Sequence, residues 1–232
     1  MVQNATKPPR HAARSPNTVA KAPTAIYALD RLGAGYRFET RLATVGPVVG
    51  GVRKGDLILQ GGGDPELDSV GLDELANELA LSGIREVDGR FLVDDSFYPM
   101  IERIDDTQPE VASYNPSISA LSLNFNRIYA EWRRVSGGYD VRVEARADGL
   151  SPPTRAAVVE IVEDTASGGA FDYVASARSE LWRVRRSALG KRGSRYLPIR
   201  RPALYAGQVF RDLARDRVPA RSLSLFPVAL WH

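Results

Sequence analysis

The 232-residue sequence predicts an α+β fold, because two kinds of hydrophobic periodicity occur in it. Apolar residues recur at helical spacing near the start of the chain, in residues 72–81 and in residues 202–217. Between these segments, short runs of alternating apolar and polar residues are separated by glycine and proline, as in strands and turns. We therefore expect a mostly β middle with a few helices around it.

The first predicted helix has one apolar face, which carries Ala25, Ile26, Leu29 and Leu32. We expect this face to lie in the core, and Gly33 to end the helix. A proline inside a helix removes a backbone hydrogen bond but is welcome at the first position, so we expect the regular helix to begin at Pro23. Thr18 and Lys21 would then lie on an irregular lead-in.

A β meander follows, with strands predicted in residues 37–44, 48–53 and 56–60. Gly61-Gly62-Gly63-Asp64-Pro65 comes directly after the last of these strands. A phosphate-binding loop would need a Gly-Lys-Ser/Thr ending, which this segment lacks. We therefore interpret the glycine run as a tight exit from the strand.

The next predicted elements are a helix at residues 72–81 and a strand at residues 86–94, which ends in Asp94-Asp95-Ser96. Adjacent carboxylates at a strand end can ligate a metal or raise each other's pKa. An exposed pair that partly caps the chain is the simpler interpretation of Asp94 and Asp95.

Residues 98–115 carry few helix or strand signals and are predicted to form a long loop, which in a compact domain is usually functional or mobile. Further strands are expected at residues 119–132, with a break near 126–127, and at residues 139–146, 158–163, 182–186 and 196–199. A final helix is expected at residues 202–217. Within the aberrant tail (218–232), residues 222–232 are apolar without a pattern, as an exposed, adhesive tail or the product of a reading-frame shift would be.

Composition excludes several kinds of chemistry. Cysteine is absent, and the two histidines, His11 and His232, lie near the chain ends, so disulfides, thiolate sites and a histidine-based triad are not expected. No apolar run is long enough to span a bilayer, and no signal peptide precedes the chain as written, which favours a cytoplasmic location. Arginines gather in residues 178–201, where we expect a solvated basic face; binding of nucleic acid or another anionic polymer is the alternative.

Several short motifs occur in a defined order. They are Thr18-x-x-Lys21, Tyr36-Arg37-Phe38-x-Thr40, Lys54-Gly55-Asp56-Leu57, Gly61-Gly62-Gly63-Asp64-Pro65, Gly89-Arg90-Phe91-Leu92-Val93-Asp94, Ser119 to Asn126 (SALSLNFN), and Pro202-Ala203-Leu204-Tyr205-Ala206. In this order they resemble peptidase family S13, the D-alanyl-D-alanine carboxypeptidases and endopeptidases of the penicillin-binding protein 4 type. The resemblance covers residues 18 to about 213.

The resemblance implies a transpeptidase-like (β-lactamase/DD-peptidase) domain that carries a large, mostly β insert. It implies serine-type hydrolysis of cell-wall peptide ends, with no metal or cofactor, and a peptidoglycan stem peptide or a β-lactam as partner. Thr18 stands at the family's serine position and Lys21 at its lysine. Asp94 lies in the region that lines the pocket for the peptide side chain. Family members are periplasmic.

Other features depart from the family pattern. The methyl group of Thr18 restricts its side chain and crowds the line of attack. Ser122-Leu123-Asn124 formally matches the second motif, Ser-x-Asn, but we interpret it as structural. The third motif, Lys-Thr-Gly, is absent, since Lys191-Arg192-Gly193 puts a guanidinium where a small hydroxyl is needed. We therefore expect an inactive fragment, truncated at both ends.

The predicted organisation has five parts: a disordered tail (1–16), the start of the transpeptidase-like domain (17–45), the β-rich insert (46–195), the return strand and helix (196–217) and an aberrant tail (218–232). The alternative function is a binding module without catalytic activity, which would hold peptidoglycan or another anionic polymer through the insert and the arginine-rich segment.

Overall fold

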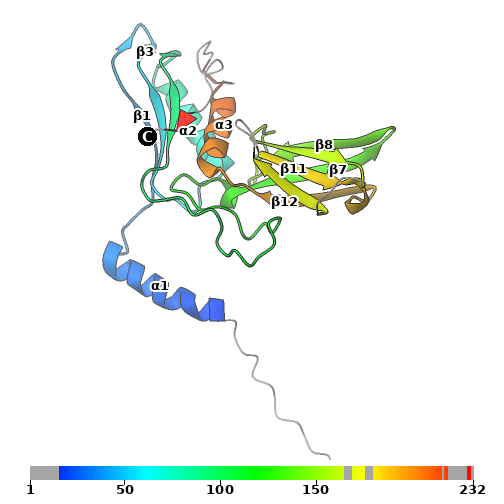
Figure 1. Cartoon of the computed structure of the whole chain (residues 1–232). Helices are drawn as coiled ribbons and strands as arrows, with labels where there is room; N and C mark the ends of the chain where they lie inside the picture. The colour runs from blue at the N-terminus through cyan, green and yellow to red at the C-terminus, as the bar shows by residue number, and fades with distance from the viewer. Residues whose placement is uncertain (1–15, 165–168, 176–179, 216, 219–228, 231–232) are drawn as a thin grey trace, which may run out of the picture. The chain divides into compact units, whose positions relative to one another are not determined.

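The computed structural model describes residues 16–164, 169–175, 180–215, 217–218 and 229–230 (Figure 1). The chain divides into two units, residues 1–37 and 38–232. The described part of the first unit is a helix followed by a short turn, and the other elements belong to the second unit. None of the helices in the described ranges combines the length and apolar character needed to cross a bilayer.

The first helix, α1, spans Pro16–Leu32 and continues through Pro23. The prediction that the helix begins at Pro23, with an irregular lead-in before it, is therefore wrong. Pro16 takes the first helical position, where the missing N–H of proline costs nothing. The helix then tolerates Pro23 in its interior, although proline there cannot donate to the carbonyl of Val19.

On the apolar face of α1, Ile26, Leu29 and Leu32 are 68%, 58% and 48% exposed, so the described residues of the first unit do not cover this face. That the face lies in a core stays a prediction. Helical spacing identifies which face is apolar but not which surface covers it. The predicted end of the helix is confirmed, because Gly33 has a φ of +82° and donates its N–H to the carbonyl of Leu29 at 3.0 Å.

The second unit contains a mixed sheet of four strands in the order β1-β4-β6-β13. These strands are β1 (Thr40–Thr44), β4 (Leu57–Gly61), β6 (Phe91–Asp94) and β13 (Ala229–Leu230). The β1–β4 pair is antiparallel, whereas β4–β6 and β6–β13 are parallel. The predicted tight exit from β4 is confirmed: a Cβ on Gly61 would lie 2.3 Å from the carbonyl oxygen of Ala120, so only glycine fits.

A small sheet has the order β2-β3-β5, formed by β2 (Val48–Val49), β3 (Val52–Lys54) and β5 (Glu86–Asp88). The prediction of one strand over residues 86–94 is therefore wrong, since β5 and β6 belong to different sheets. Gly89 makes the step between them possible, because a Cβ there would lie 2.1 Å from the carbonyl oxygen of Gly55.

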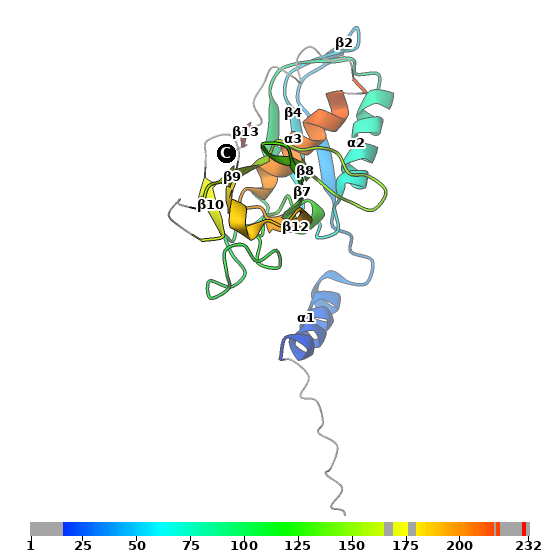
Figure 2. The same cartoon turned by 90° about the vertical axis from the view of Figure 1, so that its right-hand side faces the viewer.

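Two helices pack beside the four-stranded sheet, α2 (Ser69–Leu81) and α3 (Pro202–Arg215), as predicted from their periodicity (Figure 2). The carboxylate of Asp68 accepts hydrogen bonds from the N–H groups of Val70 and Gly71 and so caps α2. Phe210 of α3 stacks on Phe91 of β6 at a ring distance of 5.5 Å. The buried core is therefore continuous from this sheet through α3.

Two three-stranded sheets complete the second unit, with the orders β12-β7-β8 and β10-β11-β9. The strands are β7 (Arg127–Val135), β8 (Gly138–Glu144), β9 (Ala157–Val162), β10 (Phe171–Ala175), β11 (Glu180–Arg185) and β12 (Arg192–Pro198). Short 3₁₀ turns, η1 (Asn124–Asn126) and η2 (Arg186–Ala188), precede β7 and β12. Buried residues of both sheets, such as Ala130 and Trp182, join the same core.

The β-rich middle differs from the prediction in further places, since residues 48–53 were predicted as one strand but contain β2 and the start of β3, which pair antiparallel. Strand β7 begins only at Arg127, so residues 119–126 are not strand, and β10 was not predicted at all. The four residues after β10 and the four that follow 164 lie outside the described part. The predicted long loop is confirmed, since no helix or named strand lies between Asp94 and Asn124.

Both predicted tails fall mostly outside the described residues. Of the segment 218–232, Ala229 and Leu230 form β13 and pair with Leu92 and Val93 of β6. The boundaries of the predicted domains stay a prediction. The first sheet does join β1, which precedes the predicted insert, to β4 and β6, which lie within it.

Candidate functional site

Thr18 and Lys21 lie three residues apart on the continuous helix α1, so their backbone positions are one turn apart. This is the spacing that a nucleophile and its base need on a helix. Lys21 is exposed, whereas the side chain of Thr18 lies outside the described residues. The third predicted residue, Asp94, belongs to the second unit. All three roles remain predictions.

Asp94 ends β6 and is buried, with 7% of its surface exposed, so the exposed pair expected at this strand end is not formed. One carboxylate oxygen accepts hydrogen bonds from the backbone N–H of Ser96 at 3.0 Å and from its hydroxyl at 2.6 Å. The other accepts from the side-chain amide of Gln60 at 2.8 Å. Burial raises the pKa of Asp94, but these hydrogen bonds outweigh it and hold the pKa below its usual value.

We expect Asp94→Asn to lower the free energy of unfolding by about 1 to 3 kcal/mol at neutral pH, because an amide NH₂ must face a donor of Gln60 or Ser96. Because folding lowers the pKa of Asp94, this carboxylate adds to the free energy of unfolding at pH values above the ordinary pKa of aspartate. The contribution is lost as the pH falls through the pKa of Asp94 in the folded chain. Urea unfolding at pH 7 measures the effect. Asp148→Asn, at an exposed position, is the matched control, and equal midpoints for the two variants would contradict the prediction.

Asp95 does not join Asp94 in a metal site. Its carboxylate accepts a hydrogen bond from the hydroxyl of Ser119 at 3.0 Å, while Asp94 is bonded to Ser96 and Gln60. Within the described ranges, no three His, Cys, Asp or Glu side chains gather closely enough to hold a metal ion.

Asn124 of the formal Ser-x-Asn motif is buried and takes part in a structural network. Its amide donates to the hydroxyl of Ser69 at 3.0 Å and to that of Tyr205 at 3.2 Å, and its oxygen accepts from the N–H of Ser69 at 3.1 Å. The Tyr205 hydroxyl donates in turn to the carbonyl of Arg127 at 3.1 Å. Asn124 therefore ties η1 to the starts of α2 and α3, and its polar atoms are used within the fold.

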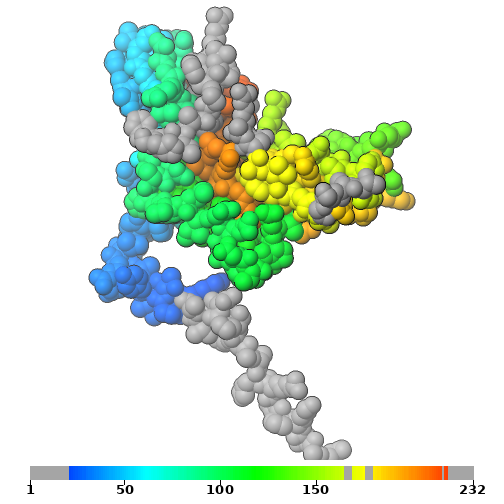
Figure 3. Space-filling view, viewed as in Figure 1, coloured from blue at the N-terminus to red at the C-terminus, as the bar shows by residue number. Residues whose placement is uncertain are grey.

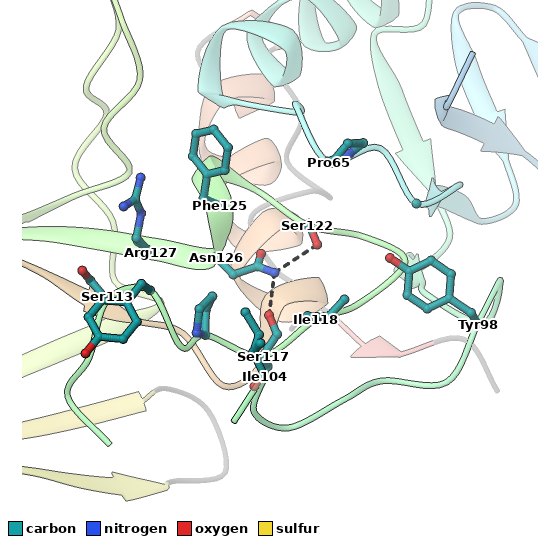
Figure 4. A pocket seen from close by; sticks show the side chains of 13 residues that line it. Pro65, Tyr98, Ile104, Ser113, Ser117, Ile118, Ser122, Phe125, Asn126 and Arg127 are labelled. Carbon is teal, nitrogen blue, oxygen red and sulfur yellow. Dashed lines mark hydrogen bonds between the residues drawn. The ribbon is translucent and has the colours of Figure 1, made fainter. Parts of the chain in front are cut away.

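A pocket of about 460 Å³ lies in the second unit, bounded by the long loop, the glycine-rich exit of β4 and the turn at η1 (Figure 4). Asn126 fixes its floor by donating to the carbonyl of Ser117 at 2.8 Å and to the hydroxyl of Ser122 at 3.0 Å. The hydroxyl of Tyr98 donates to the carbonyl of Ser119 at 2.9 Å. Sequence reasoning missed this pocket, because its walls come from segments that are distant in the chain.

The long loop is anchored by Arg200, which lies just before α3 and is 5% exposed. Its guanidinium donates to the carbonyls of Asn115 at 2.7 Å, Glu110 at 2.7 Å and Glu102 at 3.3 Å. Figure 3 shows the green loop standing out from the surface of the second unit beside the orange α3. One buried side chain therefore fixes the backbone of the segment that forms one wall of the pocket.

The buried carboxylate of Glu180 lies at the start of α3. It accepts hydrogen bonds from the N–H of Arg200 at 2.9 Å and from that of Arg201 at 2.6 Å. Burial raises the pKa of Glu180 to about 7, although these hydrogen bonds and the arginine charges act in the opposite direction. The predicted solvated basic face is thus not uniform, since Arg200 is buried; Arg178 lies outside the described residues.

Comparisons with known proteins identify the relatives of this chain. The family model of the D-Ala-D-Ala carboxypeptidase 3 (S13) family matches residues 11–186. A D-alanyl-D-alanine carboxypeptidase from Actinomadura sp. (strain R39) is 38% identical over 102 residues, which are 43% of this chain and 19% of that protein.

Solved structures of penicillin binding protein 4 from Haemophilus influenzae share the fold. One matches with a TM-score of 0.61 at 18% identity, over 89% of this chain and 45% of that chain. Another, complexed with a β-lactam, matches with a TM-score of 0.61 at 20% identity, over 92% of this chain and 45% of that chain. The matched regions cover less than half of each relative.

These findings confirm the predicted α+β fold, which corresponds to part of a penicillin binding protein 4 structure. They also confirm the resemblance that the ordered motifs indicated. Because the family model covers most of the sequence, the chain belongs to the D-Ala-D-Ala carboxypeptidase 3 (S13) family.

Proposed function

We propose that this chain is D-alanyl-D-alanine carboxypeptidase-like and that its substrates are the peptide ends of the cell wall. We also propose that these 232 residues alone do not hydrolyse them. The observation that carries the proposal is the family match over residues 11–186, which includes Thr18 and Lys21 at helical spacing on α1. In such a site, the lysine would take the proton of the hydroxyl that attacks the peptide carbonyl. We propose Asp94 as a residue of the region that recognises the peptide side chain.

The proposed lack of activity has a chemical basis. Threonine keeps a hydroxyl, but its methyl group limits the side-chain rotamers that point toward a substrate. A reacting atom displaced by about 1 Å can cost about a hundredfold in rate. The Ser-x-Asn sequence compared with the second motif, Ser122-Leu123-Asn124, has its amide, on Asn124, consumed by Ser69 and Tyr205. The sequence also contains no Lys-Thr-Gly or Lys-Ser-Gly motif.

A fluorescent penicillin tests the proposal directly. We expect no covalent adduct on the 232-residue chain, as judged by gel fluorescence and intact mass, while a full-length S13 carboxypeptidase labelled in parallel serves as the positive control. Thr18→Ser is the informative variant, because it restores the usual nucleophile and leaves everything else unchanged.

The outcomes have separate meanings. An adduct mapped by peptide mass spectrometry to Thr18 would overturn the proposed inactivity. Labelling of Thr18→Ser alone would identify the threonine as the cause. Labelling of neither protein would mean that the parts which complete the site are required as well.

A second candidate function is binding of cell-wall peptide without hydrolysis. The specific observation that favours it is the pocket of about 460 Å³, since this volume suits a small ligand. Sedimentation with purified sacculi over a series of salt concentrations separates the two candidates, because a binding module would pellet with the sacculi whether or not it reacts with penicillin.

A further inference from the structure

An uncharged, apolar segment follows β1 and includes β2. Residues 45–52 have the sequence Val-Gly-Pro-Val-Val-Gly-Gly-Val, so eight consecutive residues carry no polar side chain. Such a run is expected in a core, yet residues 45–50 are all exposed. Val45, Val48 and Val49 are 52%, 45% and 59% exposed. Single apolar residues on a surface need no explanation, but a continuous exposed group marks a surface that contacts something else.

The segment forms a tight hairpin of β2 and β3, whose outer edge is open. Val49 pairs with Val52, so Gly50 and Gly51 alone make the turn. Their φ angles of +60° and +82° suit the two-residue turn in which glycine is favoured. β2 stands at one edge of the sheet β2-β3-β5. In Figure 1 and Figure 2 the hairpin lies at one end of the second unit, where a flat partner can reach it.

Two arginines bind the backbone of the hairpin and keep their charge. The guanidinium of Arg53 donates to the carbonyl of Gly46, and that of Arg85 donates to the carbonyl of Gly50 at 3.3 Å. A Cβ on Gly51 would lie 2.7 Å from the Nε of Arg85, so this guanidinium lies against the turn itself. Neither arginine forms an ion pair with a residue of the described ranges. Bonds to carbonyl oxygens fix the two side chains without neutralising them.

The other charges near the hairpin nearly balance. Lys54 of β3 pairs with Asp88 of β5 at 2.9 Å, and both side chains are exposed. Glu86 is the second acidic residue of β5. Residues 45–54 and 84–88 together hold three basic and two acidic side chains. The hairpin therefore combines an apolar end with a small excess of positive charge beside it.

The size of the hairpin favours one kind of partner. A specific protein interface buries about 800 Å² on each partner, from about 20 to 30 residues. The exposed apolar side chains of Val45, Pro47, Val48 and Val49 fall far short of this, and none is an aromatic anchor of the kind that dominates such interfaces. β2 has two residues, too few for a partner strand to extend the sheet. A lipid bilayer needs no matching shape, and its anionic head groups attract cations.

We propose that the hairpin of β2 and β3 docks this chain on a bilayer that contains anionic lipids. Val45, Val48 and Val49 enter the boundary between the head groups and the acyl chains, while Arg53 and Arg85 lie at the level of the phosphates. Attraction of this kind falls off within a Debye length, so the binding is weak, reversible and sensitive to salt. The residues of the hairpin do not line the pocket of about 460 Å³, so membrane docking and ligand binding there are separate.

A fluorescent dye on the hairpin tests the proposal in the whole chain. The sequence has no cysteine, so Val49→Cys gives a single attachment site for an environment-sensitive dye. Val158→Cys, at a position of β9 that is 45% exposed, is the matched control. The vesicles are phosphatidylcholine alone and phosphatidylcholine mixed with phosphatidylglycerol in equal parts. We expect the emission of the dye on residue 49, but not of that on residue 158, to shift to the blue with the mixed vesicles.

Co-sedimentation of the unlabelled chain with the same vesicles measures the affinity. We expect binding to mixed vesicles to be at least about tenfold tighter than to phosphatidylcholine, and this ratio to fall as salt is added. Arg85→Gln should lower the ratio about fivefold, whereas Arg192→Gln, at an exposed position of β12, should leave it unchanged. Combining Val48→Ser with Val49→Ser should weaken binding to mixed vesicles about tenfold, and Val158→Ser should not.

Several results would overturn the proposal. Two of them need no variant: no binding to mixed vesicles, and equal binding to the two kinds of vesicle. Blue shifts of equal size on residues 49 and 158, or unchanged binding by the double serine variant, would exclude the hairpin as the docking surface. A blue shift on residue 49 at high protein concentration without vesicles would show that a second copy of the chain, and not a bilayer, covers the hairpin.

Discussion

Replacing Arg200 by methionine is expected to lower the free energy of unfolding of the second unit by about 3 to 5 kcal/mol, since each buried acceptor left unpaired costs about 1 to 3 kcal/mol. Methionine keeps the length and the apolar stem of arginine but removes all of its donors. The buried carbonyl of Asn115 and the partly buried carbonyl of Glu110 would then lose the guanidinium, whereas the carbonyl of Glu102 would keep its bond from the hydroxyl of Ser117. A loss of this size is a large part of the stability of an ordinary domain.

The same substitution should also release the long loop. Without Arg200, the loop keeps its own local bonds, such as those of the Asn115 side chain to the N–H of Asp105 at 2.9 Å and its carbonyl at 2.7 Å. It also keeps the bridge between Ile101 and Ile118. These bonds hold parts of the loop to each other, whereas Arg200 joins the loop to the start of α3. We therefore expect protease cleavage within residues 98–116 to become faster.

Urea unfolding and limited proteolysis measure the two effects. Arg192→Met is the matched control, because Arg192 is exposed on β12 and the substitution changes the same atoms. If Arg200→Met and Arg192→Met unfold at the same urea concentration and are cleaved at the same rate, Arg200 does not anchor the loop. A shift in the unfolding midpoint without faster cleavage would limit its role to the core.

The helices of the second unit could be predicted from sequence because their signals are local. Asp68 before Ser69 caps α2, and Pro202 begins α3, so each helix carries its own start. The end of β4 at Gly61 was also visible, because a run of glycines marks a place where backbones approach closely. These features depend on residues within a few positions of one another.

The errors arose where distant segments decide the structure. Residues 86–94 alternate like one strand, but Arg53 pairs with Val87, whereas Leu59 pairs with Val93, and these pairings pull the two halves into different sheets. Strand β10 depends on its pairing with β11.

The candidate site also has features that depend on neighbouring residues and features that depend on distant segments. The three-residue spacing of Thr18 and Lys21 is visible in the sequence, but their place on a helix was predicted wrongly, because Pro23 was interpreted as the start of the helix and α1 continues through it. The pocket could not be predicted, because Gly63, Tyr98 and Arg127 meet only in the folded chain.

Glu180 gives the second large effect, a stability that depends on pH. Glu180 is 2% exposed, and its carboxylate lies at the start of α3, where it accepts hydrogen bonds from the N–H groups of Arg200 and Arg201. The charged and titratable groups around it are Arg200, Arg201 and, from β10, Tyr173. Burial is the largest influence, and it raises the pKa of Glu180 to about 7.

The direction of the pH dependence follows from this raised pKa. Between the unfolded value of 4.5 and the folded value of about 7, the folded chain binds more protons than the unfolded chain. The contribution to stability is therefore complete below the unfolded pKa and is lost as the pH rises through the folded pKa. The full loss is about 3 kcal/mol, because one pKa unit corresponds to about 1.4 kcal/mol.

Glu180→Gln isolates this contribution, because glutamine has nearly the same shape and does not ionise. We expect the difference in unfolding free energy, variant minus wild type, to rise by about 3 kcal/mol between pH 4 and pH 8. Groups with lowered pKa values, such as Asp94 and Asp56, contribute equally to both proteins and cancel in the difference. Glu131→Gln, at an exposed position, should give a difference in unfolding free energy that does not change between pH 4 and pH 8.

Urea unfolding at several pH values gives the difference in unfolding free energy as a function of pH for Glu180→Gln and for Glu131→Gln. A flat difference for Glu180→Gln would mean that the carboxyl group is equally easy to ionise in the folded and unfolded chains, and that the N–H groups at the start of α3 fully offset its burial. A difference that falls as the pH rises would mean that these N–H groups and the two arginine charges outweigh burial, so that the carboxylate, and not the acid, is the form the fold prefers.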